Sequence, residues 1–287
     1  MPQNSISLRI KNILQPLSCP MVMGILNVTP DSFYSKSRAN SEQEIVNRVT
    51  AILEEGGDII DVGGYSTRPS AAEISEKEEI ERLFWALGII KKHFSQATVS
   101  IDTFRAKVAE AAIREFGVDI INDVSGGTLD DKMFEVIGRY NVPYIMMHMR
   151  GTPKSMQTFT DYDDLIEDIL RFFAEQINRL TALGVSDIIL DPGFGFAKTT
   201  EQNFELLRKL SNFQIFGRPV LAGLSRKSML FKTLNTDAEH CLTATIGANM
   251  LALAGGASIL RVHDVKEAVE TVKIYKSTYP SIGNNNQ

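Results

Sequence analysis

Eight short apolar runs recur along the chain, and each is followed by a loop and then by a stretch with helical periodicity. The runs are residues 21–28, 58–62, 98–102, 118–122, 143–148, 187–191, 219–223 and 257–263. Runs of this length, rich in Val and Ile and bounded by Gly and Pro, are typical of parallel strands that are buried on both faces. Eight alternating strands and helices predict an α/β fold, a closed (β/α)8 barrel of the TIM type.

The same repeat predicts where the chemistry lies. In such a barrel the carboxyl ends of all the strands meet at one face. The polar residues near the ends of the eight runs should therefore converge on one pocket: Asn27, Asp61, Asp102, Asn122, Asp123, His148, Asp191, Arg261 and His263.

Helical periodicity fills the segments between the runs. The expected helices are residues 41–55, 76–94, 104–116, 130–140, 162–183, 200–210, 238–254 and 265–277. Ser41 and Glu44 have the spacing of a capping box, which predicts the start of the first helix. Residues 5–17 predict a short N-terminal hairpin over the lower mouth of the barrel. We expect one domain over residues 1–287, with the barrel at about 20–278 and a disordered tail at 283–287.

Composition excludes several classes of partner. The net charge of −5 provides no general basic field for nucleic acid or for an anionic membrane, so an anionic substrate needs a local cluster of positive groups. No run approaches the roughly 20 apolar residues of a membrane span. Cys19 and Cys241 are far apart and lack metal-ligand spacing, which indicates reduced thiols and a cytoplasmic protein.

Several segments at the strand ends are more specific together than any one alone. They read Gly-Ile-Leu-Asn-Val-Thr-Pro-Asp-Ser at 24–32, Asp-Val-Gly-Gly-Tyr-Ser-Thr-Arg-Pro at 61–69, Ser-Ile-Asp-Thr at 100–103, Ile-Asn-Asp-Val-Ser-Gly-Gly at 121–127, Met-His-Met-Arg-Gly at 147–151, Leu-Asp-Pro-Gly-Phe-Gly-Phe-Ala-Lys at 190–198, Ser-Arg-Lys-Ser at 225–228 and Leu-Arg-Val-His-Asp at 260–264. From about residue 20 to residue 275, in content and order, the chain resembles the dihydropteroate synthases of the folate pathway.

The resemblance implies transfer of a dihydropterin-methyl group from its pyrophosphate ester to the amine of para-aminobenzoate, which gives dihydropteroate and pyrophosphate. The residues that match the family's pterin contacts are Asp102, Asn122, Met147, Asp191, Phe196, Gly223 and Lys227, of which Asp102, Asp191 and Lys227 are the expected catalytic residues. A carboxylate such as Asp191 suits the paired donors on one edge of a pterin, much as it suits an arginine. Met147 and Phe196 would bound the ring with soft apolar surface.

The pyrophosphate end needs converging donors and a divalent ion. The residues that match the family's anion site are Asn27, Thr67, Arg68, Arg261 and His263. The resemblance implies Mg²⁺ as the cofactor, with Asn27 as its protein ligand, and magnesium usually keeps several waters. It also implies that pyrophosphate departs early and that Asp102 stabilises the resulting pterin-methyl cation.

The para-aminobenzoate end is expected near the first two loops and the Ser-Arg-Lys-Ser segment. The matching residues are Phe33, Pro69, Arg226 and Ser228, with Ser228 at a helix N-terminus that would favour a carboxylate. Sulfonamides, which imitate para-aminobenzoate, should compete here. The chain departs from the family pattern where Tyr65 replaces a usual Glu and Ser70 a usual Gly. The resemblance also implies a homodimer, formed through the later helices.

Simpler interpretations compete with several of these roles. Asp102 and Asp61 could each cap a following helix; the barrel context favours the pocket for Asp102 and leaves both readings open for Asp61. His148 fits a buried histidine that is bonded to backbone better than a catalytic one. Residues 76–81, which are rich in Glu, fit a solvated helix face.

Two other functions fit part of the pattern. A folate-dependent corrinoid methyltransferase shares the pterin-binding barrel but has no pyrophosphate to hold, so Arg68, Arg261 and His263 favour the synthase. A non-catalytic pterin-binding barrel is the second alternative, and both charged ends of the expected site argue against it. Release of pyrophosphate that depends on para-aminobenzoate separates all three.

Overall fold

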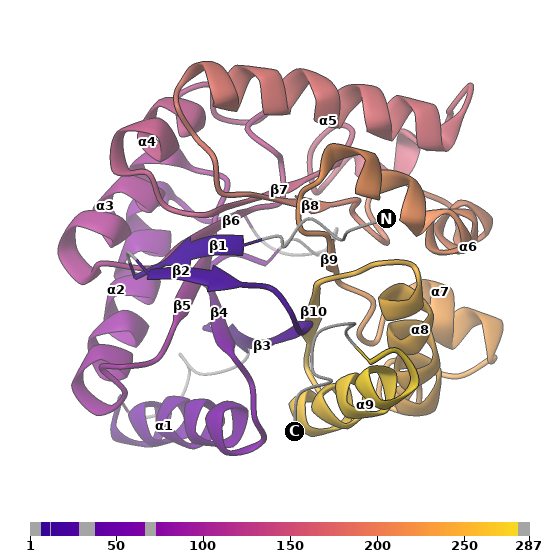
Figure 1. Ribbon diagram of the computed structural model, residues 1–287. Helices are drawn as coiled ribbons and strands as arrows, with labels where there is room; N and C mark the ends of the chain where they lie inside the picture. Colours follow the sequence, from indigo (N-terminus) through magenta and orange to yellow (C-terminus); the bar gives the residue numbers. More distant parts are fainter. Residues whose placement is uncertain (1–6, 12, 29–37, 67–72, 281–287) are drawn as a thin grey trace, which may run out of the picture.

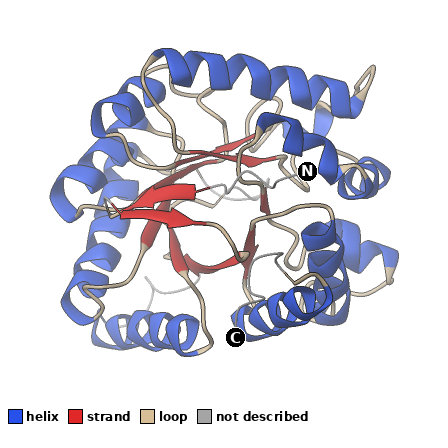
Figure 2. Ribbon diagram, viewed as in Figure 1, coloured by secondary structure: helices blue, strands red, loops and turns tan. Residues whose placement is uncertain are grey.

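The computed structural model describes residues 7–11, 13–28, 38–66 and 73–280. Eight parallel strands form a barrel, and helices surround it (Figure 1; Figure 2). The strands are β3 (Met21–Asn27), β4 (Ile59–Gly63), β5 (Val99–Asp102), β6 (Ile120–Asp123), β7 (Tyr144–Met147), β8 (Ile188–Asp191), β9 (Leu221–Ala222) and β10 (Ile259–Val262). Each coincides with one of the eight apolar runs, and β4 and β6 extend one residue beyond theirs, so the predicted fold class is confirmed.

The strand order brings the two ends of the sheet together. Neighbours follow the order β8-β7-β6-β5-β4-β3-β10-β9. A parallel bridge then pairs Leu190 of β8 with Val220, next to β9, and the Leu190 amide donates to the Pro219 carbonyl at 2.9 Å. All eight strands therefore end at the same face, as the site prediction requires.

The helices that the structure describes follow the strands in turn. They are α1 (Arg38–Glu54), α2 (Glu76–His93), α3 (Ala106–Phe116), α4 (Met133–Tyr140), α5 (Leu165–Ala182), α6 (Thr200–Arg208), α7 (Ser228–Thr233), α8 (Leu242–Ala254) and α9 (Val265–Thr278). Two 3₁₀ segments, η2 (Met156–Thr158) and η3 (Leu210–Phe216), complete the described elements. The short helix α7 is not among the eight expected helical stretches, but its start at Ser228 confirms the helix N-terminus that was expected there.

Local capping explains where several helices begin. The Ser75 side chain accepts from the Glu78 amide at α2, and Asp164 accepts from two amides at α5. A capping box does occur, but Thr199 and Gln202 form it at α6. The predicted box at Ser41 is wrong as a helix start, because α1 already begins at Arg38.

The N-terminal hairpin closes the end of the barrel opposite the strand carboxyl ends. Strands β1 (Ser7–Ile10) and β2 (Ile13–Pro16) pair in antiparallel register and cross the front of the barrel in the view of Figure 1. Leu8 and Ile10 are buried in one cluster with a ring of residues from the barrel strands: Met23, Ile59, Ile120, Ile145, Ile189, Leu221 and Ile259. The predicted hairpin over the lower mouth is thus confirmed.

Tight packing between the barrel and its helices fixes the strand ends. Ile45, Val49 and Ile52 of α1 are fully buried against the sheet. A Cβ atom on Gly24 of β3 would lie only 2.7 Å from Cγ2 of Ile52, so this strand needs glycine at that point. The predicted periodicity of the first helix therefore identifies its buried face correctly.

One expected surface is in fact partly buried. Glu79 of α2 is fully buried; its carboxylate accepts from Thr103 Oγ1 at 2.6 Å and from Arg105 Nη1 at 2.6 Å. Burial raises the pKa of Glu79, and its bond to Thr103 opposes the rise. The prediction of a solvated face over residues 76–81 is wrong for this residue, because α2 packs its first turn against the β5–α3 connection.

Candidate active site

Four residues form a row across the carboxyl-end rim of the barrel. The strand register aligns Asn27 of β3 with Gly63 of β4, Gly63 with Asp102 of β5, and Asp102 with Asn122 of β6. A Cβ atom on Gly63 would lie 3.4 Å from Asn27 Oδ1 and 3.7 Å from Asp102 Cβ, so these two side chains flank the glycine. The structure therefore brings together three residues that the sequence placed at this site.

Arg261 of β10 reaches across the barrel to two carboxylates. Its Nε donates to Asp61 Oδ2 at 2.7 Å, and its Nη2 donates to Asp102 Oδ2 at 2.7 Å. The side chain of Asp61 is fully buried, whereas those of Asp102 and Arg261 remain 13% and 22% exposed, so the pair faces the open end of the barrel. Burial raises the pKa of Asp102 to about 7, with Arg261 opposing this shift and Asp61 adding to it.

Asp61 anchors the site through two hydrogen bonds. In addition to Arg261, it accepts a hydrogen bond from Asn122 Nδ2 at 3.1 Å. Its second oxygen, Oδ1, is buried without a partner in the part of the chain that the structure describes. The sequence left open whether Asp61 caps a helix or belongs to the pocket. Its bonds to both an arginine and an amide of the site favour the pocket.

Asp191 and Lys227 face each other near the β8–α6 and β9–α7 loops. Asp191 is buried and accepts from the Gly193 amide at 2.8 Å. Burial raises its pKa, and the charge of Lys227 opposes the rise. Burial likewise lowers the pKa of Lys227 to about 8, against the pull of Asp191. The Lys227 ammonium bonds to the Phe194 carbonyl and lies 4.5 Å from the centre of the Phe196 ring.

Met147 lies in a small apolar cluster beside this pair. It is buried with Val124, Met149, Met156 and Ala197, and Phe196 packs partly exposed against the same group. Gly223, the remaining expected pterin residue, is buried directly after β9. The cluster provides an apolar surface next to the Asp191 carboxylate.

His263 follows β10 beside Arg261. Its amide donates to Ser225 Oγ at 3.1 Å, and its carbonyl accepts from Arg48 Nη2 at 2.7 Å. Burial and the charge of Arg261 lower the pKa of His263 to about 4, so the imidazole is neutral near pH 7. As a neutral ring it can still donate one hydrogen bond to an anion.

Arg226 and Ser228 flank Lys227 but lie differently from it. Arg226 donates from Nε and Nη2 to both oxygens of Asp264, at 2.9 and 2.7 Å, in a bidentate pair. Its φ of 55° lies in the left-handed region, which a non-glycine residue rarely adopts. Ser228 is exposed as the first residue of α7. The structure thus leaves Ser228 open to solvent and turns Arg226 toward Asp264.

Four expected site residues lie outside the described part of the chain: Phe33, Thr67, Arg68 and Pro69. The expected tail at residues 283–287 lies outside it as well.

Within the described part of the chain, Asn27 is the residue to compare with the expected magnesium site. No group of three or more His, Cys, Asp or Glu within the described ranges could enclose a metal ion. Asn27 Oδ1 lies at the rim, beside Gly63 of the next strand. A hard amide oxygen of this kind suits Mg²⁺, which commonly takes one or two protein ligands and completes its shell with water and substrate phosphate.

Sequence reasoning missed one buried lysine near the site. Lys198 is 3% exposed, and its ammonium lies 3.2 Å from His148 Nδ1. The expected burial of His148 and its bond to backbone are confirmed, and the lysine is a further contact that we did not expect. The signal in the sequence was its place at the end of the 190–198 motif, in which Asp191 and Phe196 had been assigned to the pterin.

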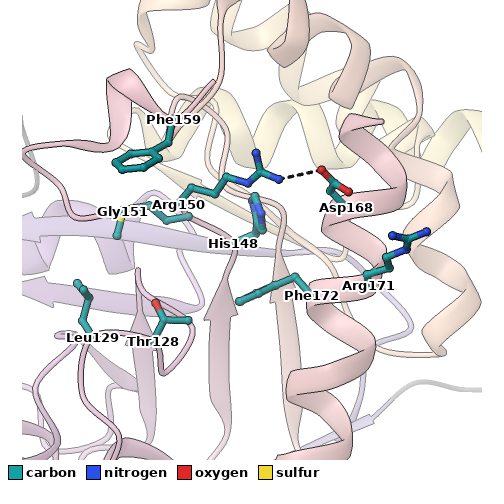
Figure 3. A pocket seen from close by; sticks show the side chains of 10 residues that line it. Thr128, Leu129, His148, Arg150, Gly151, Phe159, Asp168, Arg171 and Phe172 are labelled. Carbon is teal, nitrogen blue, oxygen red and sulfur yellow. Dashed lines mark hydrogen bonds and ion pairs between the residues drawn. The ribbon is translucent and has the colours of Figure 1, made fainter. Parts of the chain in front are cut away.

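A cavity of about 680 Å³ is lined by His148, Arg150 and Phe172, among other residues. Figure 3 shows the His148 ring between Arg150 and Phe172. Arg150 donates to Asp168 at 2.8 Å, and its guanidinium lies 3.8 Å from the centre of the Tyr162 ring. This lining arginine is therefore already paired.

Comparison with known proteins agrees with the barrel and its site. Residues 23–263 match the model of the pterin binding enzyme family. This match defines the class, a pterin-binding barrel enzyme.

The relatives define the family more closely. The dihydropteroate synthase of Synechocystis is 43% identical over 88% of this chain and 88% of its own, and that of Escherichia coli K12 is 40% identical over 91% and 93%. The crystal structure of Yersinia pestis dihydropteroate synthase with a sulfonamide drug has a TM-score of 0.88 at 38% identity, covering 96% of this chain and 100% of that one. The chain therefore belongs to the dihydropteroate synthase family, whose members are transferases. Every helix that the structure describes is too short or too polar to cross a membrane.

Proposed function

We propose that the rim residues carry out the dihydropteroate synthase reaction. It joins (7,8-dihydropterin-6-yl)methyl diphosphate to para-aminobenzoate and releases diphosphate. The observation that carries this assignment is the reach of Arg261 across the barrel to Asp61 and Asp102, beside the pair of Asp191 and Lys227. The open end of the barrel thus contains both a cation, Arg261, that can bind the leaving diphosphate and a carboxylate, Asp191, that can bind the pterin ring.

The pterin end is assigned to the wall that carries Asp191. Its carboxylate would accept the ring N–H and the exocyclic amine of the pterin, and Lys227 would donate to an acceptor on the same ring. Asn122 offers both a donor and an acceptor for the mixed edge. Phe196 and the cluster around Met147 would cover the flat faces of the ring.

The diphosphate end is assigned to the opposite side of the rim. Arg261 lies in β10 and His263 directly follows that strand, and Asn27 is the last residue of the neighbouring strand β3. Thr67 and Arg68 are proposed as further donors on family grounds. Mg²⁺, held through Asn27, would spread the charge of the leaving diphosphate when bound.

The proposed reaction begins with cleavage of the C–O bond between the pterin methylene and the diphosphate. The electron pair leaves with the diphosphate, and the methylene carbon becomes a cation that the dihydropterin ring delocalises. The aniline nitrogen of para-aminobenzoate then forms the C–N bond and loses a proton to solvent. Ionised Asp102 would stabilise the cation, and no covalent bond to the enzyme forms.

The para-aminobenzoate site is proposed at the outer rim. Ser228 at the start of α7 is open to solvent and is assigned to its carboxylate, with Arg226, Phe33 and Pro69 around the ring. Related structures support this choice of ligand: one Xanthomonas albilineans enzyme of this family holds 4-aminobenzoic acid, and the Yersinia pestis enzyme holds a sulfonamide. We therefore propose that sulfonamides compete with para-aminobenzoate in this protein.

A homodimer is proposed through the later helices. Leu251 of α8 and Ile274 of α9 are each 61% exposed, and Leu234 after α7 is 54% exposed. These helices are neighbours in the fold (Figure 1). Sedimentation should give a dimer for the wild-type chain, and Leu251→Arg should shift it toward monomer.

A cytoplasmic location is proposed from the cysteines. Cys19 and Cys241 are both unpaired in the structure, which suits a reducing compartment.

Release of diphosphate tests the assignment directly. The wild-type chain should release it only when both the pterin substrate and para-aminobenzoate are present. Asp191→Asn should reduce kcat/KM at least about 100-fold, because the paired acceptor is lost. Asp131→Asn, at an exposed position, is the matched control and should leave the rate unchanged. Pterin binding without any release would contradict the proposal.

A further inference from the structure

The loop between β8 and α6 has an unusual set of hydrogen bonds. Six consecutive carbonyls, from Gly193 to Lys198, each accept a hydrogen bond from a side chain. The donors come from different parts of the fold: Lys198, Lys227, Gln157, Lys198 again, Tyr162 and Asn203. Buried loops need such partners, because they lack the hydrogen bonds of a helix or a sheet.

Lys198 makes the most contacts in this set. Its ammonium lies 3.0 Å from the Gly193 carbonyl, 3.0 Å from the Phe196 carbonyl and 3.2 Å from His148 Nδ1. An ammonium has three N–H donors, and these three acceptors use all of them. Among the described residues, no carboxylate lies within ion-pair distance of Lys198, so a buried cation is retained here without a direct counter-ion.

His148 provides the third acceptor because its ring is neutral. Burial, together with the charge of Lys198, holds the pKa of His148 well below its usual value. The His148 amide also donates to the Asp191 carbonyl at 2.9 Å, so the histidine is attached to the strand end that carries the pterin carboxylate. Lys198 and His148 together connect the far end of the loop to the base of Asp191.

The two carbonyls that Lys198 holds belong to residues that shape the pterin wall. Gly193 donates its amide to Asp191 Oδ1 at 2.8 Å, and Phe196 carries the ring beside Lys227. A Cβ atom at Gly193 would lie 2.1 Å from the His148 carbonyl, so the loop packs directly on this histidine. Any shift of the loop would therefore move both the carboxylate and the aromatic wall.

We infer that Lys198 is a positioning residue of the pterin site: it fixes the 193–196 backbone and keeps a positive charge behind Asp191. This role rests on the proposed function of Asp191 as the pterin carboxylate. The charged groups that act on Asp191 agree with it, since Lys227, Arg261 and Lys198 all lower the pKa of that carboxylate against the effect of burial. The pKa of Lys198 is lowered to about 7, chiefly by burial and also by the charges of Lys227 and Arg150, while Asp191 opposes this shift.

Lys198→Met tests the role, because it keeps an unbranched side chain, one heavy atom shorter, and removes the ammonium. Binding of 6-hydroxymethylpterin is measured by calorimetry between pH 5 and 8, together with kcat and KM for both substrates. We expect the pterin affinity and kcat/KM for the pterin substrate to fall about 10- to 100-fold, while KM for para-aminobenzoate changes less than 3-fold. Pterin binding should weaken at low pH as Asp191 becomes protonated, and we call this fall the acid limb. Without the positive charge of Lys198 the pKa of Asp191 should rise, so the acid limb should move to higher pH.

Two further variants separate a positioning role from a purely structural one. Lys198→Arg keeps the charge and should retain the position of the acid limb, whereas Lys198→Gln keeps one donor group without charge and should shift the limb as Lys198→Met does. Lys276→Met, at an exposed position on α9, is the control and should behave as wild type. An unshifted acid limb in folded Lys198→Met would overturn the inference, and so would unfolding of both uncharged variants.

Asp191→Asn is included to keep the two failures apart. If it binds pterin as wild type does, the proposed function of Asp191 is wrong, whatever Lys198 does. If Asp191→Asn loses binding and Lys198→Met does not, only the positioning role fails.

Discussion

Arg261 and Asp61 are 200 positions apart in the chain, yet Nε of the arginine lies 2.7 Å from Oδ2 of the aspartate. The carboxylate is fully buried, whereas the guanidinium is 22% exposed toward the mouth of the barrel. Burial lowers the pKa of Arg261, but Asp61 and Asp102 together raise it above its ordinary value, so the arginine stays charged. The pair therefore presents a fixed cation to a ligand at the rim.

Arg261→Ala should affect one substrate more than the other. The guanidinium is assigned to the diphosphate, so kcat/KM for the pterin diphosphate should fall at least about 100-fold. KM for para-aminobenzoate should change only a few fold. Steady-state kinetics with each substrate varied in turn measures the split. Equal losses for both substrates would count against the assigned geometry.

Asp61→Asn should reduce activity without contact between Asp61 and substrate. The neutral side-chain amide of the variant can no longer balance the charge of Arg261. If its NH₂ group faces the guanidinium or the Asn122 amide, two donors meet there without an acceptor. We expect a loss of about 10- to 100-fold in kcat/KM for the pterin diphosphate, because the cation is no longer held in place. Asp131→Asn serves again as the exposed control. Wild-type kinetics for a folded Asp61→Asn variant would refute the anchoring role.

The lowered pKa of Lys227 predicts that activity falls at alkaline pH. Its pKa is lowered to about 8 by burial, and the neutral amine loses the positive charge and one of the three N–H donors of the ammonium, so kcat/KM should fall as pH rises through about 8. Lys227→Arg should keep its charge and lose this limb, provided that it still reaches the ring. A rate profile from pH 6 to 10 for both proteins makes the comparison.

The same lysine should act on stability in the opposite direction. Since its folded pKa lies below the usual value of 10.5, the unfolded chain binds more protons between about pH 8 and 10.5. The contribution of Lys227 to the free energy of unfolding is therefore unfavourable below about pH 8 and is relieved as the pH rises. A fall in kcat/KM with rising pH, together with a rise in the free energy of unfolding, would show that this buried charge serves activity at a cost in stability.

The sequence predicted the repeating parts of this fold and missed contacts between distant residues. The eight runs predicted every barrel strand, because buried parallel strands have a simple apolar pattern. The pattern gave no sign that Glu79 is buried, since its partners Thr103 and Arg105 come from the next connection. In the same way, the choice between the two readings of Asp61 depended on Arg261, which no local spacing could reveal.

The site residues divide along the same line. Asp102, Asn122 and Arg261 were recognisable as polar ends of strands, and the structure brings them to one rim. Lys198 lies beyond its strand end, in the loop, and its role depends on how that loop folds back over His148. Sequence position alone cannot show such a return of the chain.

The N-terminal hairpin offers a matched test of the barrel's closed end. Ile10 is fully buried among the lower barrel residues, whereas its register partner Ile13 on the other strand is 63% exposed. Ile10→Ala should lower the free energy of unfolding by about 2–5 kcal/mol, because it leaves a cavity in that cluster. Ile13→Ala removes the same atoms at the surface and should change it by no more than about 0.5 kcal/mol. Denaturant titration measures both variants.

Because the hairpin lies at the end opposite the strand carboxyl ends, kcat of folded Ile10→Ala should equal that of wild type. A loss of kcat in the folded Ile10→Ala variant alone would show that the N-terminal hairpin also controls the geometry of the rim.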